Sequence, residues 1–257
     1  MYASALTDPD GFGSALAIEV ERLEDEHHGR MHAYAELCVP EAGVLRPSMM
    51  ITWADVLCGS LANVYALPRI TMTVDLDVRV VRPVPAGSDV HGIGRVRKSG
   101  ARLAFTECAF TLADTGELVA FSAGSFMASP REQDQAPPHL RTGGPLVRGI
   151  QQPIKPVHEI VGVRVIEPGV VEADRHARLL NPADTVQGGA MALIAEEAVL
   201  TLEGATVPTE LAVRYLGAVR IGPVRAAARR DGNWVRVELT DEGNDSRLAA
   251  LAVARLG

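Results

Sequence analysis

The chain has 257 residues, of which 47% are apolar and 22% are charged, and its formal net charge is −7. This composition is typical of a globular protein, and an acidic chain argues against nucleic acid or an anionic membrane as the main partner. The N-terminal stretch carries early acids and lacks the apolar core of a secretory signal. No apolar run approaches the ~18 residues needed to span a bilayer. We therefore expect a cytoplasmic protein with no membrane partner.

The first half predicts a strand, an apolar helix and then a series of strands. Strand-like sequence covers 30–39, and a helix is predicted over 48–67. This helix is apolar on nearly every face, which indicates that protein surrounds it, and Asp55 lies in its middle. Alternation of apolar and polar residues predicts strands at 76–81, 90–98, 102–113 and 117–128.

The second half repeats this order. Strands are predicted at 162–166 and 170–178, then an apolar helix at 188–202, then strands at 211–216, 223–230, 233–240 and 247–255. The second helix carries Glu196 and Glu197. The pattern Leu-x-Val-Arg follows each helix, and the distance from the pattern to the next glycine is the same in both halves. Such a duplication predicts two α+β domains, each with a sheet wrapped around its helix.

The stretch between the two halves, 130–159, is rich in Pro, Gly and Gln and has no apolar period. Such a composition is typical of a linker. We therefore predict a first domain over 1–129, including an N-terminal extension, the linker over 130–159, and a second domain over 160–257.

The residues before the second helix resemble the signature of hot-dog-fold thioesterases of the phenylacetate-pathway and 4-hydroxybenzoyl-CoA types. In that family an Asn precedes a His-Gly-Gly that begins the central helix, and an acid lies two turns inside the helix. Here Asn181 precedes Gln187-Gly188-Gly189, and Glu196 follows. Residues 78–83, Val-Arg-Val-Val-Arg-Pro, resemble the strand and Arg-Pro corner after the helix. The resemblance implies two tandem hot-dog domains.

Both copies depart from the family pattern. The second copy has Gln187 in place of His and Glu196 in place of Asp. The first copy has Arg46-Pro47-Ser48 where His-Gly-Gly is expected, but it keeps Asp55. The two copies therefore carry different parts of the expected site.

Thioester hydrolysis needs hydrogen-bond donors for the carbonyl oxygen and a carboxylate that attacks or activates water. The Gly188-Gly189 helix start offers main-chain amides at the positive end of the helix dipole. Gly189 and Glu196 are seven residues apart, about 10 Å along one helix, so one carbonyl cannot reach both. A working site should therefore combine amides from one helix with the acid of the other.

Two composite sites follow from this constraint. The first combines Gly188 and Gly189 with Asp55, and Asn181 and Gln187 would hydrogen-bond the carbonyl or the attacking water. The second would combine Ser48 with Glu196. Because proline has no amide hydrogen, Pro47 removes a donor there. We predict that the first site is active and that the second is vestigial or keeps only a structural or binding role.

Each candidate also has a plainer interpretation. Asp55 could serve a buried structural hydrogen bond, the Gly188-Gly189 pair could be a tight turn into the helix, and Asn181 could only shape its loop. Three cations are candidate ligands of the coenzyme A phosphates or else solvated charges: Arg82, Arg97 and Lys98.

The favoured function is therefore an acyl-CoA thioesterase, which converts acyl-CoA and water into a carboxylic acid and coenzyme A. It would need no cofactor beyond the coenzyme A of its substrate, and no His or Cys spacing indicates a metal site. Two alternatives remain: a non-catalytic acyl-CoA-binding or sensing protein, and a hydratase or dehydratase, which would place a His beside the acid. The resemblance also implies a homo-oligomer of double hot-dog units.

Overall fold

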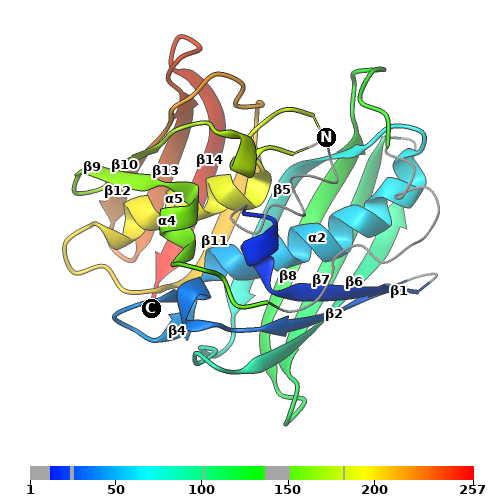
Figure 1. Cartoon of the computed structure of the whole chain (residues 1–257), viewed down its shortest axis with the longest axis horizontal. Helices are drawn as coiled ribbons and strands as arrows, with labels where there is room; N and C mark the ends of the chain where they lie inside the picture. The colour runs from blue at the N-terminus through cyan, green and yellow to red at the C-terminus, as the bar shows by residue number, and fades with distance from the viewer. Residues whose placement is uncertain (1–11, 24–25, 101, 137–150, 182) are drawn as a thin grey trace.

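The computed structural model describes residues 12–23, 26–100, 102–136, 151–181 and 183–257 (Figure 1). Its main sheet has twelve strands in the order β1-β2-β6-β7-β8-β5-β11-β14-β13-β12-β10-β9. The strands are β1 (Ile18–Arg22), β2 (Glu26–His32), β5 (Thr71–Val80), β6 (Asp89–Ser99), β7 (Leu103–Leu112), β8 (Leu118–Ala128), β9 (Val163–Glu167), β10 (Val170–Ala173), β11 (Pro208–Tyr215), β12 (Val224–Asp231), β13 (Trp234–Asp241) and β14 (Arg247–Leu256). A separate small ribbon pairs β3 (Cys38–Val39) with β4 (Val44–Leu45).

Two long helices cover one face of the sheet. The helices are η1 (Ser14–Leu16), η2 (Ala35–Leu37), α2 (Pro47–Ala66), α4 (Val157–Val161), η3 (Ala177–Leu179) and α5 (Gly188–Leu200). In Figure 1, α2 crosses the strands of the first half and α5 crosses those of the second. The prediction of antiparallel strands wrapped around each apolar helix is confirmed, and the strands of both halves belong to one sheet.

The two halves, which we call the first and second repeats, meet at β5 and β11 and form one continuous sheet. Leu76 pairs with Val213, and Val78 pairs with Leu211. Leu76 and Leu211 open the duplicated Leu-x-Val-Arg pattern, so equivalent residues exchange places across the junction. All four side chains are buried. A sequence that predicts two sheets thus folds with the central strands of the repeats hydrogen-bonded to each other.

The central helices also pack directly against each other. The amide of Ser48 in α2 donates to Glu196 in α5, and Gly189 of α5 faces Thr52 of α2. Residue numbers increase along one helix where they decrease along the other, so the helices are antiparallel. This arrangement places the start of each helix beside the middle of the other.

Several boundaries differ from the sequence prediction. The strand expected over 30–39 ends at His32, and η2 follows, while the strand expected over 170–178 ends at Ala173. Strand β1 and helix α4 were not predicted, and α4 begins inside the predicted linker. Residues 137–150 of that linker lie outside the described residues. Within the described chain, no helix has the length and apolar character to cross a membrane.

Candidate active site

Asp55 is an acid in a helix that is otherwise largely buried and apolar. It is half-buried, and its Oδ1 accepts a 2.7 Å hydrogen bond from the Thr73 hydroxyl of β5. Burial raises the pKa of Asp55 to about 6, and the Thr73 hydrogen bond opposes that rise because it favours the charged form. The carboxylate is therefore more basic than a solvated aspartate and is still ionised at neutral pH.

A cavity of about 430 Å³ connects this acid to the second repeat. Asp55, Ser60 and Asn63 line it from α2, while Asn181, Gln187, Gly188 and Tyr215 line it from the second repeat. Met72, Phe126 and Met191 are among the apolar residues of its wall. The cavity lies within the size range of small-molecule sites in proteins. Four of the predicted site residues, Asp55, Asn181, Gln187 and Gly188, therefore share one cavity.

The start of α5 supplies the main-chain donors of this cavity. Gln187 is the N-cap residue, and Gly188 is the first helical residue. First-turn amides have no acceptor within their own helix. Gly189 does not line the cavity: it is buried, and a Cβ added to it would collide with the Thr52 side chain. The second glycine therefore also serves the close approach of the two helices.

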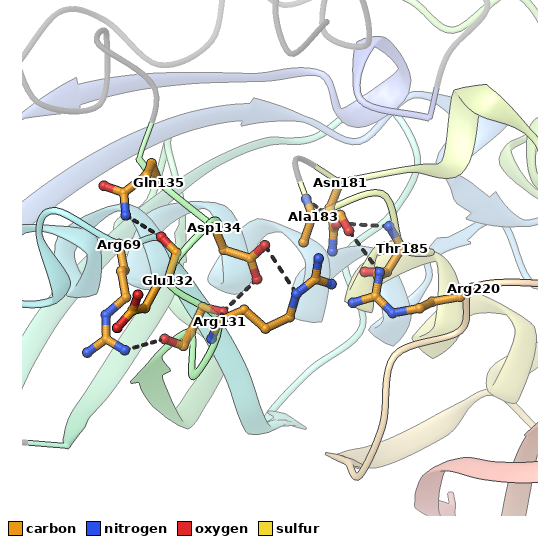
Figure 2. A network of polar contacts seen from close by, with 10 residues as sticks. Arg69, Arg131, Glu132, Asp134, Gln135, Asn181, Ala183, Thr185 and Arg220 are labelled. Carbon is orange, nitrogen blue, oxygen red and sulfur yellow. Dashed lines mark hydrogen bonds and ion pairs between the residues drawn. The ribbon is translucent and has the colours of Figure 1, made fainter.

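Asn181 shapes the loop that leads to α5. Its Oδ1 accepts hydrogen bonds from the amides of Ala183 at 3.0 Å and Thr185 at 3.2 Å. Figure 2 shows these bonds within the loop. The plainer interpretation of Asn181 is therefore realised, and only its amide nitrogen remains for a ligand in the cavity.

Tyr215, at the end of β11, was missed by the sequence analysis. Its hydroxyl donates to the Gly188 carbonyl at 3.0 Å and so holds the start of α5 in place. Burial and the nearby charge of Asp55 raise the Tyr215 pKa well above its usual value, so the phenol stays protonated. Tyr215 corresponds to Val80 in the first repeat, and this difference was the available sequence signal.

The second composite position combines the start of α2 with Glu196 of α5. An ion-pair network fills it. Asp55 and Glu196 each lie eight residues after the first residue of their helix. Glu196 accepts hydrogen bonds from the Ser48 amide at 3.2 Å and the Ser48 hydroxyl at 2.7 Å, and its Oε2 lies 3.1 Å from Arg46 Nη1. Arg46 also pairs with Glu197 at 2.7 Å. Glu196 is fully buried, so no substrate reaches its carboxylate.

Comparisons with known proteins agree with this fold. Residues 42–119, which contain α2 and strands β5, β6 and β7, match the family model of the thioesterase superfamily. A 12:0-ACP thioesterase from Umbellularia californica is similar over 92% of this chain and 99% of its own, with 10% identity and a TM-score of 0.64. An acyl-ACP thioesterase from Bacteroides thetaiotaomicron is similar over 90% and 98%, with 11% identity and a TM-score of 0.59.

The chain has the double hot-dog fold of thioesterases. The resemblance inferred from its two repeats is thereby confirmed. No curated protein sequence matches the chain.

The cations predicted to bind coenzyme A lie outside the cavity of the double hot-dog. Arg82 follows the end of β5 opposite to Thr73 and pairs with Glu117 at 2.7 Å. Arg97 pairs with Glu107 of β7 at 3.3 Å, and Lys98 is exposed on β6. None of the three is among the residues that line the cavity. Their role in coenzyme A binding stays a prediction.

Two further observations concern cysteine and metal chemistry. Cys38, Cys58 and Cys108 are buried free thiols. Within the described ranges, no cluster of three or more His, Cys, Asp or Glu side chains could hold a metal ion.

Proposed function

We propose that the chain hydrolyses acyl-CoA thioesters at the cavity between its repeats. The observation that carries this proposal is that Asp55 of α2 and the start of α5 at Gly188 line the same cavity. One repeat thus offers a carboxylate of raised basicity, and the other offers unpaired main-chain donors at a helix N-terminus. These are the two groups that acyl transfer to water requires.

The reaction then proceeds without a change of oxidation state. The amides at the start of α5 receive the negative charge that develops on the thioester oxygen. Asp55 accepts a proton from a water molecule, whose oxygen attacks the carbonyl carbon, or Asp55 attacks that carbon itself and water then hydrolyses the resulting anhydride to the free acid and the Asp55 carboxylate. The carbon–sulfur bond breaks, and coenzyme A leaves as a thiol after it gains a proton. The Asn181 amide nitrogen and the Gln187 side chain are available to orient the carbonyl or the water.

The apolar part of the cavity suits the acyl chain. Met72, Phe126 and Met191 present flexible or aromatic apolar surface there, and burial of a hydrocarbon against such surface is favourable. The same cavity carries Ser60 and Asn63 further along α2. An acyl group with both apolar and polar atoms would find partners for both.

Thiol release over a panel of acyl-CoA substrates tests the proposal. The wild-type chain should release free coenzyme A, and Asp55→Asn should lower kcat by about 10²-fold or more, because general-base catalysis typically contributes that much. Asp114→Asn is the matched control, since Asp114 is exposed in the turn between β7 and β8. Turnover that survives Asp55→Asn would contradict the assignment.

The two alternatives give different outcomes in the same assay. A non-catalytic acyl-CoA-binding protein would bind the substrate tightly without release of thiol. A hydratase or dehydratase would change the acyl chain and leave the thioester intact. Because no histidine is among the described residues that line the cavity, hydrolysis is the better supported of the two reactions.

A further inference from the structure

Two arginines from different repeats lie beside the lining of the cavity, although neither is itself a lining residue. Arg131 directly follows Pro130, and Arg220 lies two residues after Ala218, and both Pro130 and Ala218 line the cavity. Figure 2 shows the two side chains extending toward the same place beside Asn181. Neither arginine was singled out in the sequence, because each is one of many arginines in this chain.

The segment that carries Arg131 is fixed to the body of the protein. The Ser129 hydroxyl donates to Asp134 at 2.6 Å, and the Ile70 amide donates to the Asp134 carbonyl at 2.9 Å. Ile70, Ala136 and Ala183 pack together in a small apolar cluster, so this segment also contacts the Asn181 loop of the second repeat. Arg131 is therefore held at the border between the two repeats.

Both guanidinium groups retain capacity for an anion. Arg220 Nη1 donates to the Ala183 carbonyl at 3.2 Å, and the described part of the chain gives the Arg220 guanidinium no carboxylate partner, while the Arg220 amide donates to Asp241. Arg131 Nε lies 3.7 Å from Asp134, a mostly buried acid that also takes the Ser129 hydroxyl. Arg131 Nε and Nη2 also lie 3.0 Å and 2.9 Å from the side-chain amide of Gln133, which among the described contacts leaves Nη1 for an anion. Of the other acids nearby, Asp184 is paired with Arg175 at 2.8 Å, and Glu132 is exposed.

We propose that Arg131 and Arg220 form a phosphate subsite for the phosphopantetheine arm of the thioester substrate. The inference rests on the proposed thioesterase function and deepens it. Guanidinium groups match phosphate oxygens in charge and geometry. A thioester held at Asp55 carries its phosphate at the far end of the pantetheine arm, so a cation pair at the border of the cavity suits it. Coenzyme A and acyl carrier proteins share this phosphate.

Kinetics with matched substrates test the subsite. The variants are Arg131→Gln, Arg220→Gln and the double variant, with Arg236→Gln on β13 as the control for loss of an exposed arginine. Each is assayed with one acyl group on coenzyme A, on an acyl carrier protein and on N-acetylcysteamine, which lacks the phosphate. We expect a rise in KM of about tenfold for each single variant on the two phosphate-bearing substrates, and no change with N-acetylcysteamine.

Other results would overturn the subsite. An equal loss on N-acetylcysteamine thioesters would indicate a structural role, and no loss on any substrate would exclude phosphate binding. A loss confined to coenzyme A would assign the arginines to its nucleotide phosphates, and a loss confined to the carrier protein would assign them to its protein surface.

A binding measurement separates failure of the subsite from failure of the proposed function. If the wild-type chain hydrolyses no thioester, calorimetry with coenzyme A and with phosphate-free pantetheine still tests the arginines. Weaker coenzyme A binding by the two variants, with unchanged pantetheine binding, supports the subsite. Equal binding of coenzyme A by wild type and variants, or no binding at all, contradicts it.

Discussion

The main-chain amide of Ser48, near the start of α2, donates to the Glu196 carboxylate of α5 at 3.2 Å. An acid in the middle of one helix thus meets an amide at the start of the other. Asp55 is the equivalent acid of α2, and it shares a cavity with the start of α5. At one position Arg46, Ser48 and Glu196 close the space with an ion-pair network. At the other, a shorter acid and a Gly-Gly helix start leave a cavity.

The buried ion pair should be important for stability. Arg46→Met leaves Glu196 and Glu197 without their cation, and breaking a buried pair from one side typically costs about 3–5 kcal/mol. The double variant Arg46→Met with Glu196→Met should cost less, because it removes the Glu196 charge together with its partner. Urea denaturation measures both. As a control, Arg82→Ala breaks an exposed pair with Glu117 and should cost less than about 1 kcal/mol. If Arg46→Met lowers the free energy of unfolding as little as this control, the structural role of the ion pair is contradicted.

The pH dependence of hydrolysis should report Asp55. Because its pKa is raised to about 6, kcat/KM should rise tenfold per pH unit below pH 6 and level off above it. Thr73→Val removes the hydrogen bond that favours the charged carboxylate, so the midpoint should move to higher pH. A profile with its midpoint near pH 4 would mean that the carboxylate is solvated. Thiol release in buffers from pH 4 to pH 9 gives the profile.

Loss of the Asp55 charge should stabilise the protein at neutral pH. The folded-state pKa of about 6 lies above the ordinary aspartate pKa of 3.8, so the folded chain binds more protons between these pH values. Stability therefore falls as pH rises from about 4 to 6 and stays lower above that range. Asp55→Asn should relieve up to about 3 kcal/mol at pH 8 and little at pH 4. Thermal unfolding at the two pH values measures the difference; Asp114→Asn should show none.

The close approach of the helices at Gly189 should resist a side chain. Gly189→Ala places a Cβ against the Thr52 side chain and should cost about 1–3 kcal/mol, a typical cost of overpacking. Thr52→Ala removes the two nearest of those atoms, so the double variant should recover part of the loss. Chemical denaturation of the two single variants and the double variant gives the coupling energy. Strictly additive costs would show that the two residues do not press on each other.

The sequence by itself determined the duplicated architecture. Helix α2 was predicted within one residue at each end, and the later strands of both repeats were placed closely, because apolar periodicity and turn residues are local signals. Strands β5 and β11 begin earlier than predicted, at Thr71 and Pro208. It also singled out Asp55, Gln187 and Gly188, since an acid in an apolar helix and a Gly-Gly helix start are visible without a structure. The one-dimensional distance along a helix sufficed to predict that amide and acid must come from different helices.

Only the tertiary structure decided which side chains share a space. Tyr215 reaches the start of α5 from β11, and Thr73 reaches Asp55 from β5. Each of these residues is distant in sequence from the residue that it contacts, so the two roles depend on strand register. Arg46 closes the space around Glu196. Its side chain is 2% exposed and lies between Glu196 and Glu197, and no local sequence pattern shows these contacts. Contacts of this kind depend on how two repeats pack, and packing is not encoded in the spacing within either one.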